Sequence, residues 1–203
     1  MALPLQPNLR PAPPWLLRIL MILGLAALVL GLGWIQEAYR SPPRLLETHG
    51  REDGFVATTE RHIDRAQNRV WVMLFVLRRE NDGIGPVTTL VEALARAAAR
   101  GVDVRVVLDQ SLRWGSDEVE TKHIEAAQWL ESLGVPVLID SLEQRTHAKT
   151  LLIDDRWTII GSHNWTFSAL ARNVELSLLV EDRRIAKEVA AVFRRTPGWE
   201  ELR

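Results

Sequence analysis

The sequence of 203 residues contains no cysteine. It therefore forms no disulfide, thiolate metal site or thiol nucleophile, and any chemistry must come from His, Lys, Ser, Asp or Glu. It also lacks a strong net charge, since 25 Lys and Arg face 26 Asp and Glu. The chain as a whole has no general affinity for polyanions, so any phosphate recognition has to be local. No internal repeat is visible, and each motif below occurs once.

The longest stretch without a charged residue lies near the amino terminus, at 19–35. Together with Trp15 to Leu17 it would span roughly 30 Å as a helix, which is the thickness of a bilayer core. Trp15 and Trp34 bracket it as interfacial aromatic residues, and Arg18 can extend its guanidinium towards the headgroups. We therefore expect an amino-terminal tail at 1–14 and a transmembrane anchor at 15–35, which makes the chain a single-pass membrane protein.

Two other readings of this stretch stay open: a cleaved secretory signal and a hydrophobic helix buried in the domain. The basic residues on its two sides are similar in number, so the sequence does not predict which side of the membrane holds the domain. Residues 36–50 are expected to be a linker, stiffened by Ser41-Pro42-Pro43. The catalytic domain is then expected at 51–203.

The expected domain alternates strand and helix patterns. Apolar runs predict strands at 70–77, 102–108, 135–139, 148–153, 157–160 and 174–180. Helices are expected at 87–100, from Ser116 or Asp117 to about 133, and at 183–195, with Gly101 and Gly134 just beyond the first two. This order predicts an α/β sandwich with a mixed β-sheet flanked by helices.

The most informative segment is His147-Ala148-Lys149, followed by Asp154 and then by Gly161-Ser162-His163-Asn164. Residues two apart on a strand share a face, so the His147 imidazole and the Lys149 ammonium should project together. Gly161 allows a tight turn, and Ser162 can cap a helix that begins near Trp165. The side chains and free amides of that turn are expected to form an anion site.

These residues at these spacings resemble the signature of the phospholipase D superfamily, H-x-K-x4-D followed by G-S-x-N. Every signature position is filled, and the order of elements across about 55 to 195 is similar to that of the branch with one motif per chain. That branch includes bacterial nucleases and a mitochondrial-surface endonuclease with an amino-terminal anchor. Asn173 and Glu175 extend the resemblance, because family members carry a downstream carboxylate that holds the catalytic histidine.

The resemblance implies a phosphodiesterase without metal or cofactor, in which His147 attacks phosphorus and forms a phosphohistidine. A second histidine protonates the leaving oxygen, and water then attacks with the roles reversed. Because the motif occurs once, the second histidine is expected from a second chain, so that a homodimer shares the active site. Lys149, Ser162 and Asn164 are expected to bind the phosphate oxygens, and Glu175 to accept a hydrogen bond from the other imidazole nitrogen.

Asp154 completes the signature and belongs to the expected catalytic set. Its separation from His147 along the strand nevertheless favours a structural role, in the hairpin turn or beside a neighbouring basic group. His163 is not expected to bind a metal, because the spacing supplies no further ligands. The remaining histidines, His49, His62 and His123, are expected at the surface.

Further candidates follow the strand expected at 102–108, whose end should open on the side of the motif. Asp109, Arg113 and Trp114 are expected to line a substrate groove, although Trp114 could equally pack against its own loop. All three are weaker candidates than the motif residues, because no spacing rule connects them to a particular reaction.

Three functions are compatible with these features: an endonuclease on RNA or DNA, a phospholipase D acting on phosphatidylcholine-type lipids, and a noncatalytic phosphate-binding dimer. The noncatalytic alternative is disfavoured because no position of the motif has been lost. The single motif and the small size favour a nuclease. The predicted anchor and the balanced charge keep the phospholipase as the alternative.

Overall fold

The computed structural model describes residues 15, 18–19, 21–28, 41–49, 52–110, 122–141 and 145–202. The chain divides into two compact units, Met1–Arg40 and Ser41–Arg203. In the first unit, residues 15, 18–19 and 21–28 are helical, and the rest of the predicted anchor lies outside the described residues. Across the described ranges of the chain, no helix has both the length and the apolar character needed to cross a bilayer.

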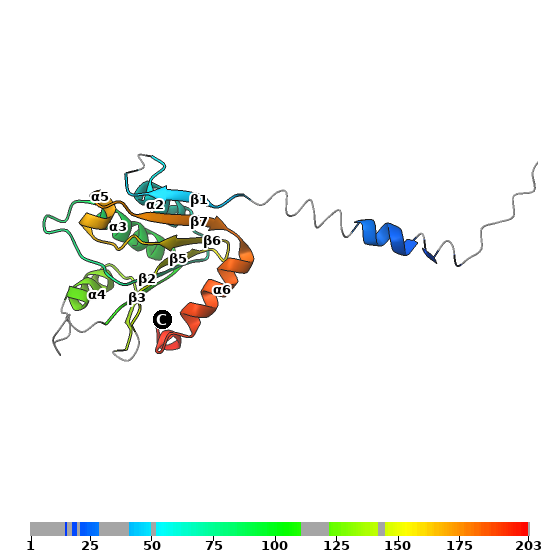
Figure 1. The fold of residues 1–203 in the computed structure, drawn as a ribbon. Coiled ribbons are helices and arrows are strands. Elements are labelled where there is room, and N and C mark those ends of the chain that lie inside the picture. The colour runs from blue at the N-terminus through cyan, green and yellow to red at the C-terminus, as the bar shows by residue number, and fades with distance from the viewer. Residues whose placement is uncertain are drawn as a thin grey trace, which may run out of the picture. The chain divides into compact units, whose positions relative to one another are not determined.

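The second unit is built on a seven-stranded sheet with the order β1-β7-β6-β5-β2-β3-β4 (Figure 1). Strands β2, β3 and β4 are mutually parallel, whereas the other neighbouring pairs are antiparallel. The mixed sheet expected from the sequence is therefore confirmed. In chain order the strands are β1 (Arg44–Glu47), β2 (Arg69–Leu74), β3 (Asp103–Leu108), β4 (Val137–Ile139), β5 (Lys149–Ile153), β6 (Trp157–Gly161) and β7 (Leu176–Glu181).

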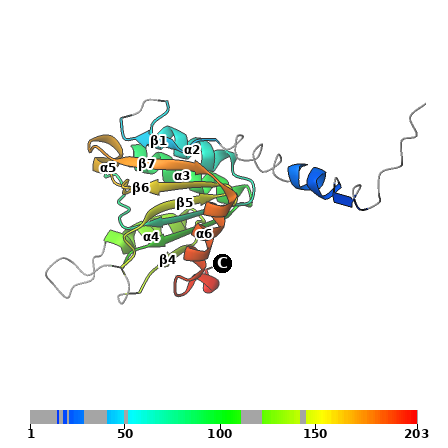
Figure 2. The same ribbon diagram turned by 45° about the vertical axis from the view of Figure 1, so that its right-hand side comes forward.

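Helices cover the two faces of the sheet unequally (Figures 1 and 2). The larger core joins one face to α2, α3, α4 and α5, and the smaller core joins the other face to α6 and η1. This unequal cover leaves part of the second face without a helix. The helices are α2 (Phe55–Arg65), α3 (Pro86–Ala99), α4 (Lys122–Ser132), α5 (Phe167–Ala171), α6 (Arg183–Arg194) and the 3₁₀ turn η1 (Trp199–Glu201).

The interior strand β2 follows the expectation for a strand buried on both faces, since Val70 to Leu74 are all buried. It ends three residues before the predicted end at Leu77. Beyond Leu74 the regular ladder stops, and an isolated bridge joins Leu77 to Trp165. This bridge brings the loop after β2 beside the G-S-x-N segment, which it helps to hold in place.

The start of β1 and the position of α5 correct two expectations. The predicted linker at 36–50 contains β1, which pairs with β7 and buries Leu46, so the compact unit begins at Ser41 rather than at residue 51. The helix after the motif is capped by Thr166, whose hydroxyl accepts from the Ala169 amide, and not by Ser162. Helix α2 was not predicted at all.

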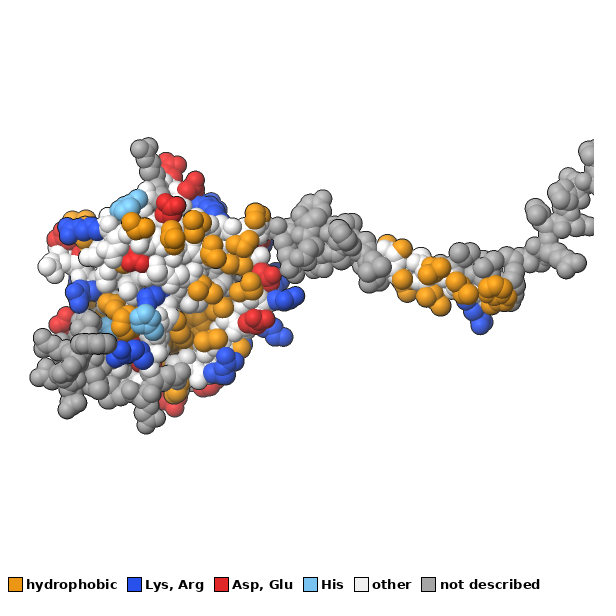
Figure 3. All heavy atoms as spheres, viewed as in Figure 1, with side chains coloured by type: hydrophobic (Ala, Val, Ile, Leu, Met, Phe, Trp, Pro, Cys, Tyr) orange, Lys and Arg blue, Asp and Glu red, His pale blue; other side chains and the backbone are white. Residues whose placement is uncertain are grey.

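The face that carries α6 leaves an apolar area uncovered on β1, β7 and β6. Leu45, Ile160, Leu176 and Leu178 point out of this face and are between 44% and 51% exposed. Leu178 pairs directly with Leu45 on one side and Ile160 on the other, so their side chains form a row. We call these four residues the open sheet face. Figure 3 shows its apolar side chains as a patch that extends towards a histidine.

Candidate active site

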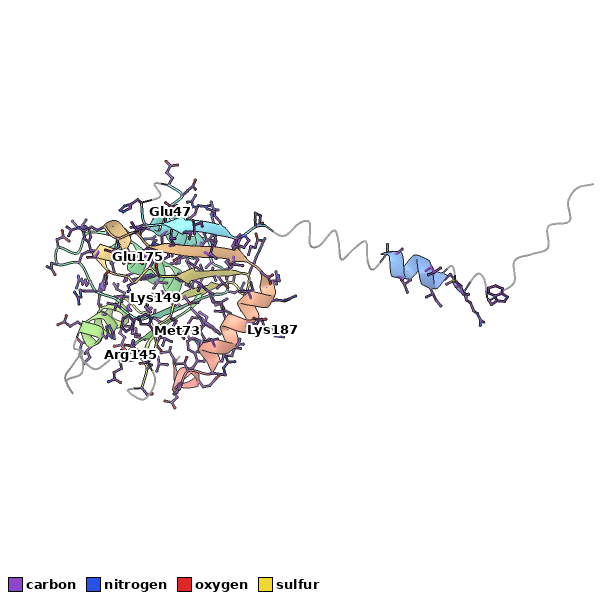
Figure 4. All side chains as sticks on the ribbon, viewed as in Figure 1. Glu47, Met73, Arg145, Lys149, Glu175 and Lys187 are labelled. Carbon is purple, nitrogen blue, oxygen red and sulfur yellow. The ribbon has the colours of Figure 1, made fainter. Side chains whose placement is uncertain are left out.

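The motif residues meet at one edge of the sheet because the strands that carry them alternate in direction. His147 and Lys149 lie at the start of β5, and Ser162 follows the end of β6. Glu175 precedes β7, so its position is at the same edge. In Figure 4, Glu175 and Lys149 lie at this end of the sheet, apart from Lys187 on α6.

The His147 and Lys149 side chains converge, as their spacing on one strand predicts. Lys149 Nζ lies 3.4 Å from His147 Nδ1 and donates a hydrogen bond of 2.8 Å to the His147 carbonyl. Burial lowers the pKa of Lys149, and the charges of Glu175 and Asp109 offset only part of that effect. A partly desolvated ammonium interacts more strongly with an anion than one in bulk water. The pair therefore places a cationic group that can bind an anion beside the exposed His147 imidazole.

Phe75 supports this pair from the loop after β2 and was not recognised as a site residue in the sequence. Its ring lies 4.3 Å from the His147 ring and 4.9 Å from Lys149 Nζ, as measured from the ring centroid. The Phe75 amide also donates to the Ala148 carbonyl at 3.0 Å, which fixes the backbone next to His147. The sequence feature that could have indicated Phe75 is its position as an aromatic residue near the end of the apolar run at 70–77.

Glu175 is ionised and held by polar neighbours other than His147. Its carboxylate accepts one hydrogen bond from the Ser162 hydroxyl and another, of 3.0 Å, from the side-chain amide of Asn173. Burial, the largest single effect, raises the pKa of Glu175, but these hydrogen bonds and the nearby basic side chains together outweigh it, so the pKa lies below its usual value. The expected hydrogen bond between Glu175 and the His147 imidazole is not formed in this structure.

The G-S-x-N segment forms a compact turn against β7. The Ser162 amide donates to the Leu176 carbonyl at 3.0 Å, and the Leu176 amide donates to Ser162 Oγ at 3.1 Å. A side chain at Gly161 would overlap Ser177 and Leu176, so glycine is required for close strand approach rather than for an unusual turn. Asn164 Oδ1 is buried without a hydrogen-bond partner, which leaves this amide unsatisfied at the site.

His163 is a buried structural residue. Its ring stacks on Phe55 at 3.9 Å, and its nitrogens contact Ser177 Oγ at 2.7 Å and Thr48 Oγ1 at 3.2 Å. Burial lowers the pKa of His163 to about 4, although the charge of Glu175 acts in the opposite direction. The ring is therefore neutral at physiological pH and joins β1, α2 and β7 below the site.

Asp154 lies at the opposite end of β5 from His147, about 20 Å away along an extended chain. Its carboxylate accepts from the backbone amides of Gln67, Asn68 and Arg69 at 2.7 to 3.2 Å. These hydrogen bonds join Asp154 to the turn before β2 as well as to its own hairpin, and its place in the catalytic set stays a prediction. Asp154 has a φ of 53°, the left-handed conformation that this hairpin turn requires.

Asp109 lies at the end of β3, on the expected side of the sheet. It is fully buried, and neither carboxylate oxygen has a hydrogen-bond partner. Its charge acts on Lys149, so it belongs to the electrostatic environment of the site rather than to an exposed groove wall. Arg113 and Trp114, like the helix cap expected at Ser116 or Asp117, lie outside the described residues.

The other histidines do not all lie at the surface as expected. His123 is buried, and His62 is half-buried and contacts Trp157. Only His49, next to Thr48, is exposed. In the described part of the chain, His49 is therefore the one exposed imidazole besides His147.

A cavity of about 260 Å³ lies against His147. Arg145 and Arg195 contribute guanidinium groups to its wall, and Met73 and Val192 contribute apolar surface. Figure 4 places Arg145 and Met73 at the same end of the sheet as Lys149. The volume is below the usual range for drug-sized ligands, so it fits a phosphate with a few attached carbon atoms.

Comparison with known proteins agrees with this geometry. The profile of the family described as "Cardiolipin synthase, PLD-like domain" matches residues 60–196. A protein named phospholipase D from Rickettsia prowazekii is 32% identical over 125 residues, which cover 62% of this chain and 54% of that protein. Cardiolipin synthase A of Proteus mirabilis is 29% identical over 112 residues, or 53% of this chain and 21% of that protein. The chain thus spans about half the length, or less, of these curated relatives.

Solved structures show the same fold. Nuc from Salmonella typhimurium, a phospholipase D family member, superimposes with a TM-score of 0.61 at 22% identity, over 79% of this chain and 97% of Nuc. NucT from Helicobacter pylori gives a TM-score of 0.54 at 16% identity, over 76% of this chain and 94% of NucT. The profile match extends over most of the compact unit and includes the whole H-x-K-x4-D and G-S-x-N signature. The chain therefore belongs to the phospholipase D superfamily.

Proposed function

We propose that this protein hydrolyses phosphodiesters through a phosphohistidine formed on His147. The observation that carries the proposal is the contact between the His147 imidazole and the Lys149 ammonium at an accessible edge of the sheet. A nucleophile and a fixed cation in contact are what in-line displacement at a phosphate diester needs. The roles of Lys149, Ser162, Asn164 and Glu175 follow from the superfamily signature.

In the proposed reaction, His147 Nε2 attacks phosphorus, and the bond from phosphorus to the leaving oxygen breaks. A second histidine donates a proton to that oxygen. Water then attacks the phosphohistidine, gives its proton to the second histidine and releases His147. Attack by Nε2 requires the proton of His147 to stay on Nδ1. Glu175 is proposed to accept a hydrogen bond from this Nδ1–H when substrate draws Lys149 to the phosphate.

The second histidine is proposed to be His147 of a second copy of the chain. His163 is neutral and buried, and His123 is buried, so neither can act as an acid at the edge of the sheet. The open sheet face supports this proposal, because it is an apolar surface beside the site that a second copy could cover. A twofold axis near His147 would bring both imidazoles to one phosphate.

Two substrate classes are proposed, and nucleic acid is the first. Arg145 and Arg195 line the cavity against His147 together with Asp140, and Lys149 contacts His147 directly. These three cations could bind successive backbone phosphates. Phospholipid is the second candidate, favoured by the names of the relatives, phospholipase D and cardiolipin synthase. Anchoring by residues 15–35 in a membrane remains part of the proposal.

The test uses the full chain in detergent with bis(p-nitrophenyl) phosphate, single-stranded DNA and phosphatidylcholine vesicles as parallel substrates. Activity should survive EDTA and fall on the order of 10⁴-fold or more in His147→Ala. His49→Ala is the matched control and should retain activity. Loss of activity on chelation, restored by a divalent ion, would contradict the mechanism. Inactivation by His49→Ala would instead identify an acid within the same chain.

A further inference from the structure

A second apolar surface lies on the loops at the active-site edge, separate from the open sheet face. Ile84 is 78% exposed, Phe167 is 42% exposed and Val174 is 87% exposed. They come from three different segments: the loop before α3, the first turn of α5 and the loop before β7. We call these three residues the apolar rim.

The members of the rim are neighbours in space. Ile84 and Phe167 line one cavity of about 440 Å³. Val174 follows Asn173. The backbone amide of Asn173 donates a hydrogen bond of 2.8 Å to the carbonyl of Ser168, which also lines that cavity. Glu175 of the active site comes directly after Val174. The rim therefore borders the site where the diester is proposed to bind.

Arginine side chains surround the rim. Arg78 and Arg79 line the cavity, and the Arg172 guanidinium lies 5.0 Å from the centre of the Phe167 ring. Of the two carboxylates in the cavity wall, Glu80 is buried and accepts from the Val87 and Thr88 backbone amides at the start of α3. Glu175, next to Val174, accepts hydrogen bonds from Ser162 and Asn173. The exposed charges around the cavity are therefore Arg78, Arg79 and Arg172 against Asp82.

The fold holds Ile84 in its exposed position. Gly83 and Gly85 flank it with φ values of 67° and 153°, and a side chain at Gly85 would overlap Glu80. The Ile84 amide donates to Asp82 Oδ1 at 3.1 Å. The aliphatic side chain of Ile84 therefore projects from a tight loop whose conformation is fixed by these contacts.

We propose that the apolar rim and its arginines contact the surface of an anionic phospholipid bilayer. Aliphatic tips can enter the headgroup region while guanidinium groups bind lipid phosphates, and each basic residue near such a surface strengthens the contact about fivefold. This inference rests on the proposed function, and it favours phospholipid, the second of the two proposed substrate classes, because the rim borders the site of His147.

Single-stranded nucleic acid fits the rim less well. Sequence-independent binding of single strands uses aromatic rings on which bases stack. Ile84 and Val174, the two most exposed members, are aliphatic, and the Phe167 ring already has the Arg172 guanidinium over it. A protein partner also fits less well, because the core of a protein interface packs as densely as a protein interior, whereas the rim offers three separate side chains.

The absence of cysteine allows a direct test. Single-cysteine variants Ile84→Cys and Val174→Cys of the full chain would each carry one nitroxide label, with Lys187→Cys on α6 as the matched control. Reconstituted vesicles would contain phosphatidylcholine with or without phosphatidylglycerol. Collision of the label with oxygen and with a water-soluble nickel chelate would report its surroundings.

With phosphatidylglycerol present, the labels at residues 84 and 174 should lose nickel accessibility and gain oxygen accessibility, whereas the label at 187 should keep both. In an Arg78→Gln/Arg172→Gln background, a higher fraction of phosphatidylglycerol should be needed for the same protection. Equal nickel accessibility at all three positions would overturn the proposal. Protection from both reagents would overturn it in favour of a protein partner, and a response only to added oligonucleotide in favour of nucleic acid.

These outcomes do not depend on catalysis. Hydrolysis of bis(p-nitrophenyl) phosphate in detergent tests the His147 reaction without a bilayer. An active enzyme whose rim labels stay in water would refute the bilayer contact alone. An inactive enzyme whose labels enter the bilayer would refute the proposed reaction alone.

Discussion

His147 lies between an aromatic ring, an ammonium group and a cavity, and each of these neighbours has a separate consequence. Phe75 limits the orientations of the imidazole, and Lys149 occupies the space beside Nδ1. The cavity with Arg145 leaves room for the groups attached to phosphorus. Since Glu175 is bound to Ser162 and Asn173, the tautomer needed for attack depends on a rearrangement when substrate arrives.

Burial of His163 predicts a dependence of stability on pH. The pKa is about 4 in the folded protein and 6.5 in an unfolded chain, so the unfolded state binds more protons between these values. The free energy of unfolding should therefore be highest above pH 6.5 and fall by about 3 kcal/mol between pH 6.5 and 4. Urea unfolding followed by tryptophan fluorescence would measure it. The variant His163→Gln should be less stable, with a flatter profile, and an equally steep profile would contradict the assignment.

The contacts of Asp154 predict an effect on stability rather than on chemistry. Asp154→Ala removes hydrogen bonds to three backbone amides and places alanine at a positive φ. We expect a loss of about 3 kcal/mol in the free energy of unfolding. Asp154→Asn, which tolerates that φ, should lose less. Turnover by folded Asp154→Asn near that of the wild type supports the structural role, and inactivity of the folded variant would place Asp154 in the catalytic machinery.

At the scale of elements, the sequence predicted what depends on periodicity and end signals. Strands β2, β3 and β5 and helices α3 and α6 lie within a few residues of the predicted ranges, because their apolar patterns are continuous and their ends carry Gly or Asp. Helix α2 was missed because a polar sequence with few apolar residues folds there against the sheet. Strand β1 was missed because its short, half-exposed run follows two prolines and forms only through pairing with β7.

The site shows the same division. His147 and Lys149 could be placed together from strand geometry, because both lie on one segment. The partners of Glu175 and the contact of Phe75 could not, because they depend on how the loops after β2 and β6 pack. Asp154 accepts hydrogen bonds from three backbone amides that lie 85 or more residues away in the sequence, and no local pattern reveals such contacts.

The open sheet face predicts a specific way to break the proposed dimer. Leu178 lies in the middle of the open sheet face and is 45% exposed, so Leu178→Asp should leave the fold of one chain intact. It should convert the proposed dimer to a monomer and reduce hydrolysis to the level of His147→Ala, as measured by light scattering in detergent and by diester turnover. The matched control is Ile124→Asp on α4, where Ile124 is 42% exposed.

The control should remain a dimer with full activity. If Leu178→Asp also remained an active dimer, a second copy would have to bind elsewhere. If both variants dissociated, general loss of solubility or stability would explain the effect better than the open sheet face.

At the scale of the whole molecule, one chain supplies one of the two histidines that the proposed reaction needs. It carries one copy of the motif, and the two buried histidines cannot supply the acid. The proposal therefore makes assembly part of catalysis, and a monomer should bind a diester but not cleave it efficiently. This distinguishes the account from one in which each chain works alone.

The most direct test is a purified mixed dimer with one wild-type chain and one His147→Ala chain, each carrying a different affinity tag. Its single remaining imidazole can attack phosphorus or protonate the leaving group, but not both. Activity on an unactivated diester should fall far below half, towards that of the double variant. A substrate with a good leaving group needs little protonation, so its loss should be smaller, by up to about 10² to 10⁴-fold. A mixed dimer with His49→Ala in one chain should keep full activity, and half of the wild-type activity on both substrates for the His147→Ala mixed dimer would contradict a shared site.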